Sequence, residues 1–378
     1  MNRGTFSLFA ALAPGAVLFA TEVAPIDAAH ALPTRKHQGI PSIAVSKVNG
    51  RMWSTFYADP MGGENHLNYC VLTTSSDDGR TWKEVLYADP DGTGLTRAFD
   101  PEVWISPDGV LRWTWAERTA DPGICLTNAW NGGSGQHTDV LVGVELDAER
   151  EPSPPYPPCR RLLKGVMMCK PTVVASGDWV YPLCEWFAAP STRFYATRDG
   201  RSFRYLGGVV VPKKWRLFDE GQFVERRDGA WRVLLRNKNG LCESTSTDKG
   251  LTWPEAAASN LGHPSARLFF TRLPSGNLLL VKHGRVGEAL KERKELRAFV
   301  STDDGLSWKG GLLIDGRVNV SYPDGDVDRN GRIVIVYDRE RRADREVLFA
   351  RFTEKDATAG DDKAPGVELR RVISRSPN

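Results

Sequence analysis

The stretch Ser75–Trp82 reads SSDDGRTW, and the same eight-residue pattern returns as STDKGLTW at Ser246–Trp253 and as STDDGLSW at Ser301–Trp308. A degenerate copy, ATRDGRSF, lies at Ala196–Phe203. The pattern Ser-x-Asp-x-Gly-x-(Thr/Ser)-Trp is typical of a hairpin turn, because Asp and Gly take the tight backbone positions and the Asp carboxylate accepts backbone N–H groups. The Trp is expected to pack underneath. Three full copies in one chain indicate a repeated structural unit, not a catalytic motif.

A second pattern alternates with the first. It consists of an apolar strand, a turn containing Asp-Gly, Asn-Gly or Ser-Gly, and another apolar strand, which is a hairpin signature. Its six copies are SIAVSKVNGRMWSTFYA, EVWISPDGVLRWTWA, PTVVASGDWVYPLCEW, QFVERRDGAWRVLLRN, FFTRLPSGNLLLVKH and DVDRNGRIVIVYD. Most copies precede another strand pair. Two hairpins per unit make a four-stranded antiparallel sheet, so six units predict an all-β, six-bladed β-propeller.

The composition agrees with a turn-rich globular protein. The 378 residues carry 50 Lys+Arg and 47 Asp+Glu, which gives a formal net charge of +3. This balance lacks the basic excess of a nucleic-acid binder. The 36 Gly and 24 Pro fit a chain that turns often, and the 12 Trp suit a carbohydrate partner, because sugars stack on aromatic faces. We predict little helix, with Glu288–Glu295 as one candidate turn, and ring closure by a strand such as Val367–Ile373 or by one near the N-terminus.

The N-terminus has the order of a secretory signal peptide. Arg3 precedes the mostly apolar run Phe6–Ala20, and Ala29-His30-Ala31 supplies small residues for cleavage. We therefore expect residues 1–31 to be a signal peptide, residues 32–378 to be a single propeller domain, and the protein to be secreted or periplasmic. A buried N-terminal strand is the alternative. The apolar run is too short for a comfortable membrane span, and no later segment approaches that length.

Neither cysteines nor short motifs point to a cofactor. The six cysteines are Cys70, Cys125, Cys159, Cys169, Cys184 and Cys242. One disulfide is compatible with them but none is required, because several lie in apolar strand-like runs where cysteine acts as a small hydrophobic residue. The sequence has no CxxC or Cys/His cluster, glycine-rich phosphate loop or Ser–His–Asp signature. We expect no cofactor and no metal.

Eight-residue repeats of this kind, known as Asp-boxes, on a six-bladed propeller resemble the sialidase superfamily. Sialidases hold the substrate carboxylate with three arginines and use a tyrosine nucleophile, activated by a glutamate, together with an aspartic acid as acid/base. A neutral phenol suits such a substrate, because its carboxylate would repel an anionic nucleophile. The resemblance implies an exo-acting, retaining glycoside hydrolase that releases a terminal sialic acid or a related acidic sugar.

The second half of the chain carries the specific motifs. The segment FDEGQFVERRDGAWRVLLRN resembles the strand pair that supplies the general base and the second arginine, which implies Glu220 and Arg236. The segment ELRAFVSTDDGLSW resembles the stretch with the third arginine, which implies Arg297. The segment VNVSYPDGDVDRNGRIVIVYD resembles the nucleophile strand, which implies Tyr322.

The first half departs from the family pattern. Sialidases open with Arg-Ile-Pro, whereas this chain has Gly39-Ile40-Pro41, so the first arginine is missing from its expected position. Downstream, in GGENHLNYCVL, the acid/base position holds Glu64, which can transfer the same proton but reaches one methylene further than aspartate. Candidates for the missing cation are Arg35, Lys36, His37 and Arg97. Lysine or histidine would lose the bidentate fork of arginine.

Other polar residues should lie on the same face, because inner strands line the axis of a propeller. They can contact substrate or pair with one another, and Arg267 beside an acidic neighbour would be a structural ion pair. These residues are Asp100, Glu102, Lys170, Glu185, His263, Arg267 and Asp324. By contrast, the charge-rich stretch Asp338–Glu346 (DRERRADRE) is predicted to be a solvated turn.

Two further functions stay open on the sequence. A propeller polysaccharide lyase, or another glycosidase acting on uronate-containing glycans, would use His37 or Tyr322 as its base. A non-catalytic glycan-binding propeller would have lost its first arginine through decay of the site. The expected partner is in every case a glycan or an acidic sugar.

Overall fold

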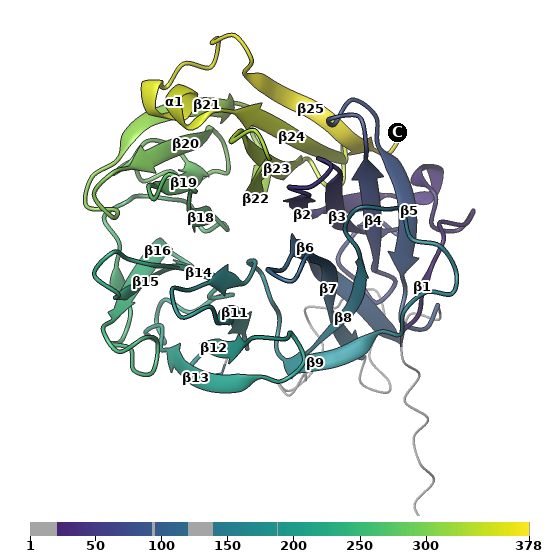
Figure 1. Ribbon diagram of the computed structural model, residues 1–378, viewed down its shortest axis with the longest axis horizontal. Helices are drawn as coiled ribbons and strands as arrows, with labels where there is room; N and C mark the ends of the chain where they lie inside the picture. Colours follow the sequence, from purple (N-terminus) through teal and green to yellow (C-terminus); the bar gives the residue numbers. More distant parts are fainter. Residues whose placement is uncertain (1–20, 93–94, 120–138, 187, 378) are drawn as a thin grey trace, which may run out of the picture.

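The computed structural model describes residues 21–92, 95–119, 139–186 and 188–377, and these residues form six antiparallel sheets arranged as a ring (Figure 1). Blades 2 to 6 each have four strands that follow chain order from the axis outward, and blade 1 has a fifth, outermost strand. The predicted all-β, six-bladed propeller is confirmed.

The bounds of the elements follow blade by blade. Blades 1 and 2 contain β1 (Val23–Ala24), β2 (His37–Val45), β3 (Met52–Asp59), β4 (Tyr69–Ser75) and β5 (Lys83–Ala88), then β6 (Thr96–Ile105), β7 (Val110–Thr119), β8 (Val140–Asp147) and β9 (Arg160–Lys164). Blades 3 and 4 contain β10 (Thr172–Val173), β11 (Trp179–Cys184), β12 (Thr192–Thr197) and β13 (Arg204–Val209), then β14 (Gly221–Glu225), β15 (Trp231–Asn237), β16 (Gly240–Ser246) and β17 (Ala257–Ala258). Blades 5 and 6 contain β18 (Phe269–Arg272), β19 (Leu278–His283), β20 (Leu296–Ser301) and β21 (Lys309–Asp315), then β22 (Val320–Val327), β23 (Ile333–Arg339), β24 (Glu346–Phe352) and β25 (Glu368–Arg375).

The two sequence patterns occupy fixed places in the blades. Each of the six predicted hairpins forms the two innermost strands of a blade, and the eight-residue repeats join the third strand to the fourth in blades 1, 3, 4 and 5. In the first repeat, Asp77 accepts hydrogen bonds from Thr81 N at 2.9 Å and Thr81 Oγ1 at 2.6 Å. Gly79 has φ +80°, and a Cβ there would lie 2.7 Å from the Phe349 ring, so this turn requires glycine.

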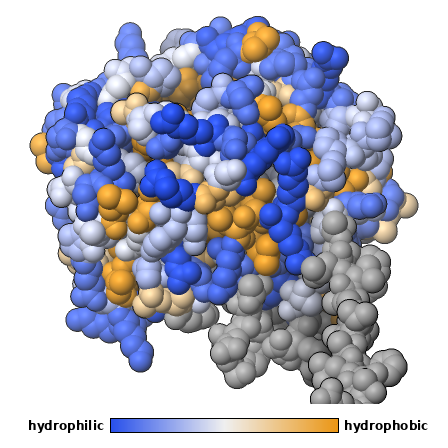
Figure 2. Space-filling model, turned by 60° about the horizontal axis from the view of Figure 1, so that its bottom comes forward, coloured by the Kyte–Doolittle hydropathy of each residue, from blue (hydrophilic) through white to orange (hydrophobic). Residues whose placement is uncertain are grey.

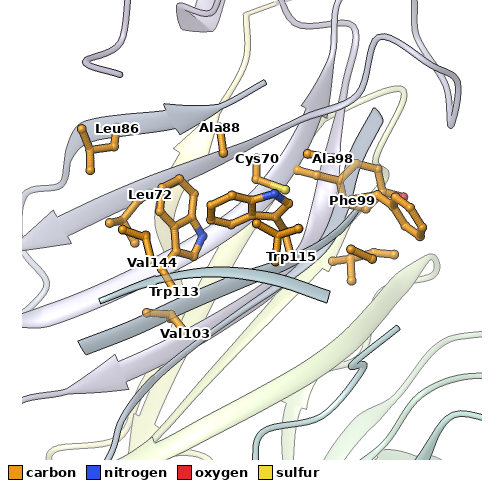
Figure 3. Packing of buried hydrophobic residues seen from close by; sticks show 14 of the residues in the cluster. Cys70, Leu72, Leu86, Ala88, Ala98, Phe99, Val103, Trp113, Trp115 and Val144 are labelled. Carbon is orange, nitrogen blue, oxygen red and sulfur yellow. The ribbon is translucent and has the colours of Figure 1, made fainter. Parts of the chain in front are cut away.

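Tryptophans fill the interface between blades 1 and 2. Trp113 and Trp115 of β7 have ring centroids 5.0 Å apart and belong to one buried cluster with Cys70 and Leu72 of β4 (Figure 3). Trp113 Nε1 donates a hydrogen bond to Thr55 Oγ1 of blade 1 at 2.8 Å. The indole therefore removes apolar surface from water and also satisfies its polar N–H across the blade boundary.

The ring closes through side chains between blades 6 and 1. Among the described strands, every blade is built from consecutive strands, and β25, which contains most of the predicted Val367–Ile373 strand, is the outermost strand of blade 6. Ser42 Oγ donates to Asp324 Oδ2 at 2.8 Å, and Val45 N donates to Asp326 Oδ2 at 2.8 Å. Carboxylates on β22 thus hold the inner strand of blade 1.

The short helical elements differ from the prediction. The expected helical turn at Glu288–Glu295 is wrong, because this segment is an irregular loop whose ends are fixed by hydrogen bonds from Gly287 N to Leu261 O and from Gly284 N to Glu295 O. The described residues instead contain the helix α1 (Glu354–Ala359), capped by Thr353, and a 3₁₀ turn at Leu32–Thr34.

Residues 21–31 pack on blade 1. Strand β1 pairs with β5, Val23 is buried, and the His30 ring stacks on Tyr87 with centroids 3.7 Å apart. The carbonyl of His30 accepts hydrogen bonds from Arg35 and from the Tyr69 hydroxyl. The apolar run of the expected signal peptide, within residues 1–20, lies outside the described residues.

The surface is largely polar. Figure 2 shows a face on which hydrophilic residues surround separate hydrophobic patches. None of the helices in the described residues is long and apolar enough to cross a membrane. The described cysteines, Cys70, Cys159, Cys169, Cys184 and Cys242, are all free thiols, and Cys125 lies outside the described residues.

Candidate active site

A cavity of about 270 Å³ lies at the end of the propeller axis where the inner strands begin. It brings together five of the residues expected from the sequence, namely Glu64, Asp100, Glu220, Arg236 and Tyr322. Its remaining lining residues are Ile40, Trp186, Phe218, Arg293 and Arg341.

Three of the inner strands place a side chain at the cavity by the same local backbone conformation. Ile40, Asp100 and Tyr322 each precede a proline, and their φ values are +53°, +48° and +51°. The pairing register of β2, β6 and β22 with the next strand shifts at these positions, as in a β-bulge. Non-glycine residues with positive φ are uncommon, and such strain collects at functional sites. The repeated X-Pro bulge is the local reason that these side chains face one cavity.

Tyr322, Glu220 and Arg236 form one hydrogen-bond network. The Tyr322 hydroxyl donates to Glu220 Oε1 at 3.2 Å, and Arg236 Nη1 donates to the same Glu220 oxygen at 2.7 Å. Arg236 Nη1 also donates to the Tyr322 oxygen at 2.9 Å. All three residues are buried, so the charge-assisted bonds act in a low-dielectric setting. Glu220 Oε2 is buried without a hydrogen-bond partner among the described residues and is free to accept.

The phenol of Tyr322 is kept neutral and lies between cations. Burial, followed by the charge of Glu220, raises the pKa of Tyr322 above its usual value, and the nearby arginines oppose this rise. The guanidinium carbons of Arg293 and Arg341 lie 5.3 Å and 4.4 Å from the centroid of its ring. At neutral pH the hydroxyl therefore keeps its proton, and Glu220 is the hydrogen-bonded acceptor placed to take it.

The arginine that lines the cavity from blade 5 is Arg293, and the structure does not place the expected Arg297 there. Arg297 lies in strand β20, where it pairs with Glu295 at 2.9 Å and donates to the Gly311 carbonyl, and it does not line the cavity. Arg293 comes from the preceding loop and donates to Ser321 Oγ at 2.7 Å and to the Ser265 carbonyl at 3.0 Å. Among the described residues, no carboxylate forms an ion pair with Arg293.

Arg341 supplies a further cation from an unexpected place. It belongs to the stretch Asp338–Glu346, whose two end residues are buried in strands, while Arg342 and Ala343 at the tip are exposed, as expected of a solvated turn. Arg341 Nε donates to Asp338 Oδ2 at 2.8 Å, and Arg341 Nη1 lies 3.6 Å from Glu64 Oε1. The turn between β23 and β24 thus places Arg341 at the cavity, while the tip of the turn is exposed to solvent.

Two carboxyl groups, Glu64 and Asp100, line the cavity besides Glu220. Burial and the charge of Glu64 raise the pKa of Asp100 to about 8, with a smaller contribution from Glu220 and opposition from Arg97. Asp100 is therefore protonated at neutral pH. A neutral carboxylic acid and a carboxylate at one site are a common arrangement for proton transfer.

Several residues expected near the substrate serve the scaffold instead. Arg35 pairs with Glu84 at 2.6 Å beneath blade 1, and Arg97 stacks on Phe99 with 3.8 Å to the ring centroid. His37 is buried beside Tyr57, and its pKa is lowered well below normal by burial and by the charges of Arg341 and Arg342. None of the three lines the cavity, so His37 is not placed to act as a base there.

Below the cavity, buried charges close the axis. Arg267 Nη1 lies 2.9 Å from Glu102 Oε1, and Arg267 Nη2 lies 3.4 Å from Asp324 Oδ1. Lys170 Nζ is 2.9 Å from Asp324 Oδ2. Glu102 and Asp324 lie two residues beyond Asp100 and Tyr322 on the same strands. Arg267 is thus an ion-pair residue beneath the cavity, as the sequence alternative allowed.

A second cavity, of about 830 Å³, lies at the opposite end of the axis, where the inner strands finish. It is lined by strand-end residues such as Ile105, Glu225, Arg272 and Val327. It contains neither the tyrosine nor the arginine cluster of the smaller cavity, so the smaller cavity is the candidate active site.

Two aromatic side chains that the sequence analysis missed form one wall of the candidate active site. Trp186 and Phe218 meet edge to face with centroids 5.5 Å apart, and Arg236 lies over Phe218 at 4.7 Å. Both residues lie outside the strands, where periodicity gives no signal. Trp186 as the last residue of the third hairpin pattern and a Phe just before Glu220 were the available cues.

Comparison with known proteins agrees with the architecture. Residues 153–335 match the BNR repeat-like domain family. The chain is similar to the intramolecular trans-sialidase from Ruminococcus gnavus, solved with oseltamivir carboxylate, with 14% identity, a TM-score of 0.65, and coverage of 91% of this chain and 99% of that one. The fold is that of the sialidase-like BNR propellers.

Other solved structures share this sialidase-like propeller. A Dyadobacter fermentans protein of unknown function has 18% identity and a TM-score of 0.61, with 86% of this chain and 95% of that chain covered. The α-L-arabinofuranosidase Arb93A from Fusarium graminearum has 9% identity and a TM-score of 0.56, with 85% and 94% covered. A search of curated protein sequences gives no match. At these identities the likeness establishes the fold, and the chemistry depends on this chain's own residues.

Proposed function

We propose that the protein is an exo-acting, retaining glycoside hydrolase of the sialidase type, which releases a terminal sialic acid or a related acidic sugar from glycans. The observation that carries this proposal is the contact between Tyr322 and Glu220 inside a cavity ringed by arginines. The sialidase-like fold and the glycosidases among similar structures support it by analogy.

The arginines provide the binding step. Arg236 is compensated by Glu220 at 2.7 Å, whereas Arg293 has only neutral partners among the described residues. A guanidinium presents a planar fork of N–H donors that matches a carboxylate. A sugar with a carboxylate beside its anomeric carbon would therefore bind with that carboxylate on the arginine side of the cavity and its anomeric carbon toward Tyr322.

In the first chemical step, Tyr322 Oη attacks the anomeric carbon while Glu220 Oε1 takes the phenolic proton. The glycosidic C–O bond breaks, and its electron pair leaves with the aglycone oxygen, which takes a proton from Glu64. This step requires Glu64 to be protonated in the substrate complex. The product is a covalent aryl glycoside, in which Tyr322 Oη is bonded to the anomeric carbon. The neutral phenol supports this assignment, because a resident anion would be repelled by the substrate carboxylate.

In the second step, Glu64, now ionised, takes a proton from water, and the water oxygen attacks the anomeric carbon. The bond to Tyr322 Oη breaks, and the proton on Glu220 returns to the phenolate. Two inversions at one carbon give net retention. Asp100, as a neutral acid at neutral pH, is placed to donate a hydrogen bond to the bound sugar.

The test is a panel of aryl glycosides of N-acetylneuraminic acid, a second nonulosonic acid, glucuronic acid and, as the neutral arm, α-L-arabinofuranose. We expect turnover of at least one acidic glycoside, with the first-formed anomer retained by proton NMR. Folded protein that cleaves no acidic glycoside would overturn the proposal. Cleavage of the arabinofuranoside alone would indicate a glycosidase that does not need a carboxylate, and a new ultraviolet absorbance from an unsaturated product would indicate a lyase.

A further inference from the structure

A side chain at position 39 would occupy the space that the Arg341 side chain fills. A Cβ placed on Gly39 would lie 2.7 Å from both Cγ and Cδ of Arg341, and 2.9 Å from Asp338 Oδ2. These are middle atoms of the arginine side chain, which cannot move aside without moving the guanidinium. The backbone of Gly39 is outside the left-handed region, so its conformation suits any residue. Glycine is needed at this position for space and not for its φ angle.

The turn that carries Arg341 is joined to the strand that carries Gly39. Gln38 N donates to the Arg341 carbonyl at 3.1 Å. Asp338 Oδ2 accepts from Ile40 N at 2.7 Å and from Arg341 Nε at 2.8 Å. The carboxylate of Asp338 therefore fixes the arginine against β2 from the side, and the missing side chain at Gly39 lets the arginine stem pass.

The guanidinium of Arg341 has N–H donors at the cavity that make no hydrogen bond within the described residues. It lies 4.4 Å over the Tyr322 ring, and Nη1 is 3.6 Å from Glu64 Oε1, which is beyond hydrogen-bond distance. Nη2 is buried and has no hydrogen-bond partner among the described residues. An unsatisfied, buried N–H of a charged group is costly unless a ligand atom completes it. The complement of these donors is an anionic oxygen pair next to Tyr322.

We propose that Arg341 and Gly39 act as a linked pair, in which Arg341 binds the carboxylate of the substrate from the β23–β24 turn and Gly39 is the opening that admits it. The inference rests on the proposed function, since it assigns a binding role within the same cavity. It also adds a property of this chain: recognition of the acid group depends on two residues from opposite ends of the sequence, which meet where the ring closes.

The experiment measures binding of free N-acetylneuraminic acid and glucuronic acid, and of their methyl esters, by calorimetry. Of the two acids, the one that the wild type binds more tightly should bind with higher affinity than its own methyl ester. Arg341→Ala should weaken binding of the acid about 10- to 100-fold, the usual range for a lost charge-assisted hydrogen bond, and leave the ester nearly unchanged. Gly39→Ala should also weaken binding of the acid, because it displaces Arg341. The matched control is Arg342→Ala, the next residue and an exposed one, which should bind like the wild type.

The double variant Gly39→Arg/Arg341→Ala, which moves the guanidinium to β2, should regain most of the preference for the acid. Melting temperatures of all variants distinguish loss of binding from loss of fold. Turnover with an unchanged acid preference in Arg341→Ala would overturn the linked pair and leave the proposed hydrolase standing. Acid binding that depends on Arg341 without any turnover would overturn the proposed hydrolase and leave the linked pair standing. A folded wild type that neither binds acids nor cleaves their glycosides would overturn both.

Discussion

The hydroxyl of Tyr322 lies 3.2 Å from Glu220 Oε1, and Arg236 Nη1 donates to both residues. A phenol whose pKa is raised by burial needs a base within hydrogen-bond reach before it can act as a nucleophile. The contact thus joins the proposed nucleophile, its proposed base and one arginine of the cavity in a single buried network.

Removing either member of this contact should abolish turnover without unfolding the chain. Tyr322→Phe deletes the attacking oxygen, and Glu220→Gln deletes the base, so each should lower kcat at least about 100-fold. Steady-state assays with the aryl glycoside that the wild type cleaves best give the measurement. The control is Tyr205→Phe on the outer strand β13, which is half exposed and should be fully active. Turnover retained in Tyr322→Phe would exclude this tyrosine as the nucleophile.

Protonation of Asp100 should make the stability of the protein depend on pH in a definable window. Its pKa is raised from 3.8 to about 8, so the folded protein holds a proton that the unfolded chain releases above about pH 4. Stability from this group is fully present below pH 4 and is lost as the pH rises toward 8, by up to about 1.4 kcal/mol per pH unit. Asp100→Asn, which tolerates the positive φ, should flatten the melting-temperature curve between pH 5 and 8.

The matched control for this experiment is Asp108→Asn. The pKa of Asp108 is lowered, mainly by the hydrogen bond from Ser106 and the charge of Arg112, against a desolvation that raises it. Its contribution is lost only as the pH falls below about 4, so the control curve should run parallel to the wild type above pH 5. Parallel curves for Asp100→Asn as well would contradict the assignment of a neutral Asp100.

The ion pairs beneath the cavity should carry a large share of the stability. Asp324 faces Arg267 and Lys170 and accepts hydrogen bonds from Ser42 Oγ and Ile43 N. Asp324→Ala leaves the buried Arg267 and the partly buried Lys170 without their shared partner, and we expect a loss of about 3–5 kcal/mol in the free energy of unfolding by urea. Asp178→Ala removes a pair with the exposed Arg198 and should cost about 1 kcal/mol or less. Equal losses would show that the axial cluster is not a special element of the scaffold.

Residues 21–31 should stabilise blade 1. A chain that begins at residue 32 loses β1, the hydrogen bond from Thr21 to Glu117, and the His30 carbonyl that satisfies Arg35 and Tyr69. We expect it to melt at a lower temperature than a chain that begins at residue 21. We also propose that the protein is exported and that any leader is removed before Thr21 instead of after Ala31, which N-terminal sequencing of the exported protein would show. Identical melting of the two chains would remove the objection to cleavage after Ala31.

Tyr322, Glu220 and Arg236 could be predicted from the sequence because the segments that carry them resemble sialidase motifs at matching places within their blades, and all three line one cavity in the structure. The same comparison located blade 5 but selected Arg297, although the arginine that lines the cavity is Arg293. The difference arises because Arg293 lies in the loop between β19 and β20, whose length does not follow the repeat. Spacing along a strand is inherited from the fold, whereas the path of a loop is set by tertiary contacts.

The position of Arg341 at the cavity could not be predicted from the sequence, for a related reason. Its stretch is so rich in charge that its composition matches a solvated turn, and composition cannot distinguish a turn above the axis from one at the rim. The sequence nevertheless showed that Gly39 occupies the position where an arginine was expected. Only the structure shows that a side chain at position 39 would occupy the space that Arg341 fills.

The buried pairs of Arg267 with Glu102 and Asp324 make the candidate active site a blind pocket, separated from the cavity at the other end of the axis. A released sugar therefore has to leave by the opening through which the substrate entered, and a glycan chain cannot be threaded through the ring from one cut to the next. The proposed hydrolase should release its polymer after every cleavage, and the free sugar acid should inhibit it competitively, because product and substrate use the same opening.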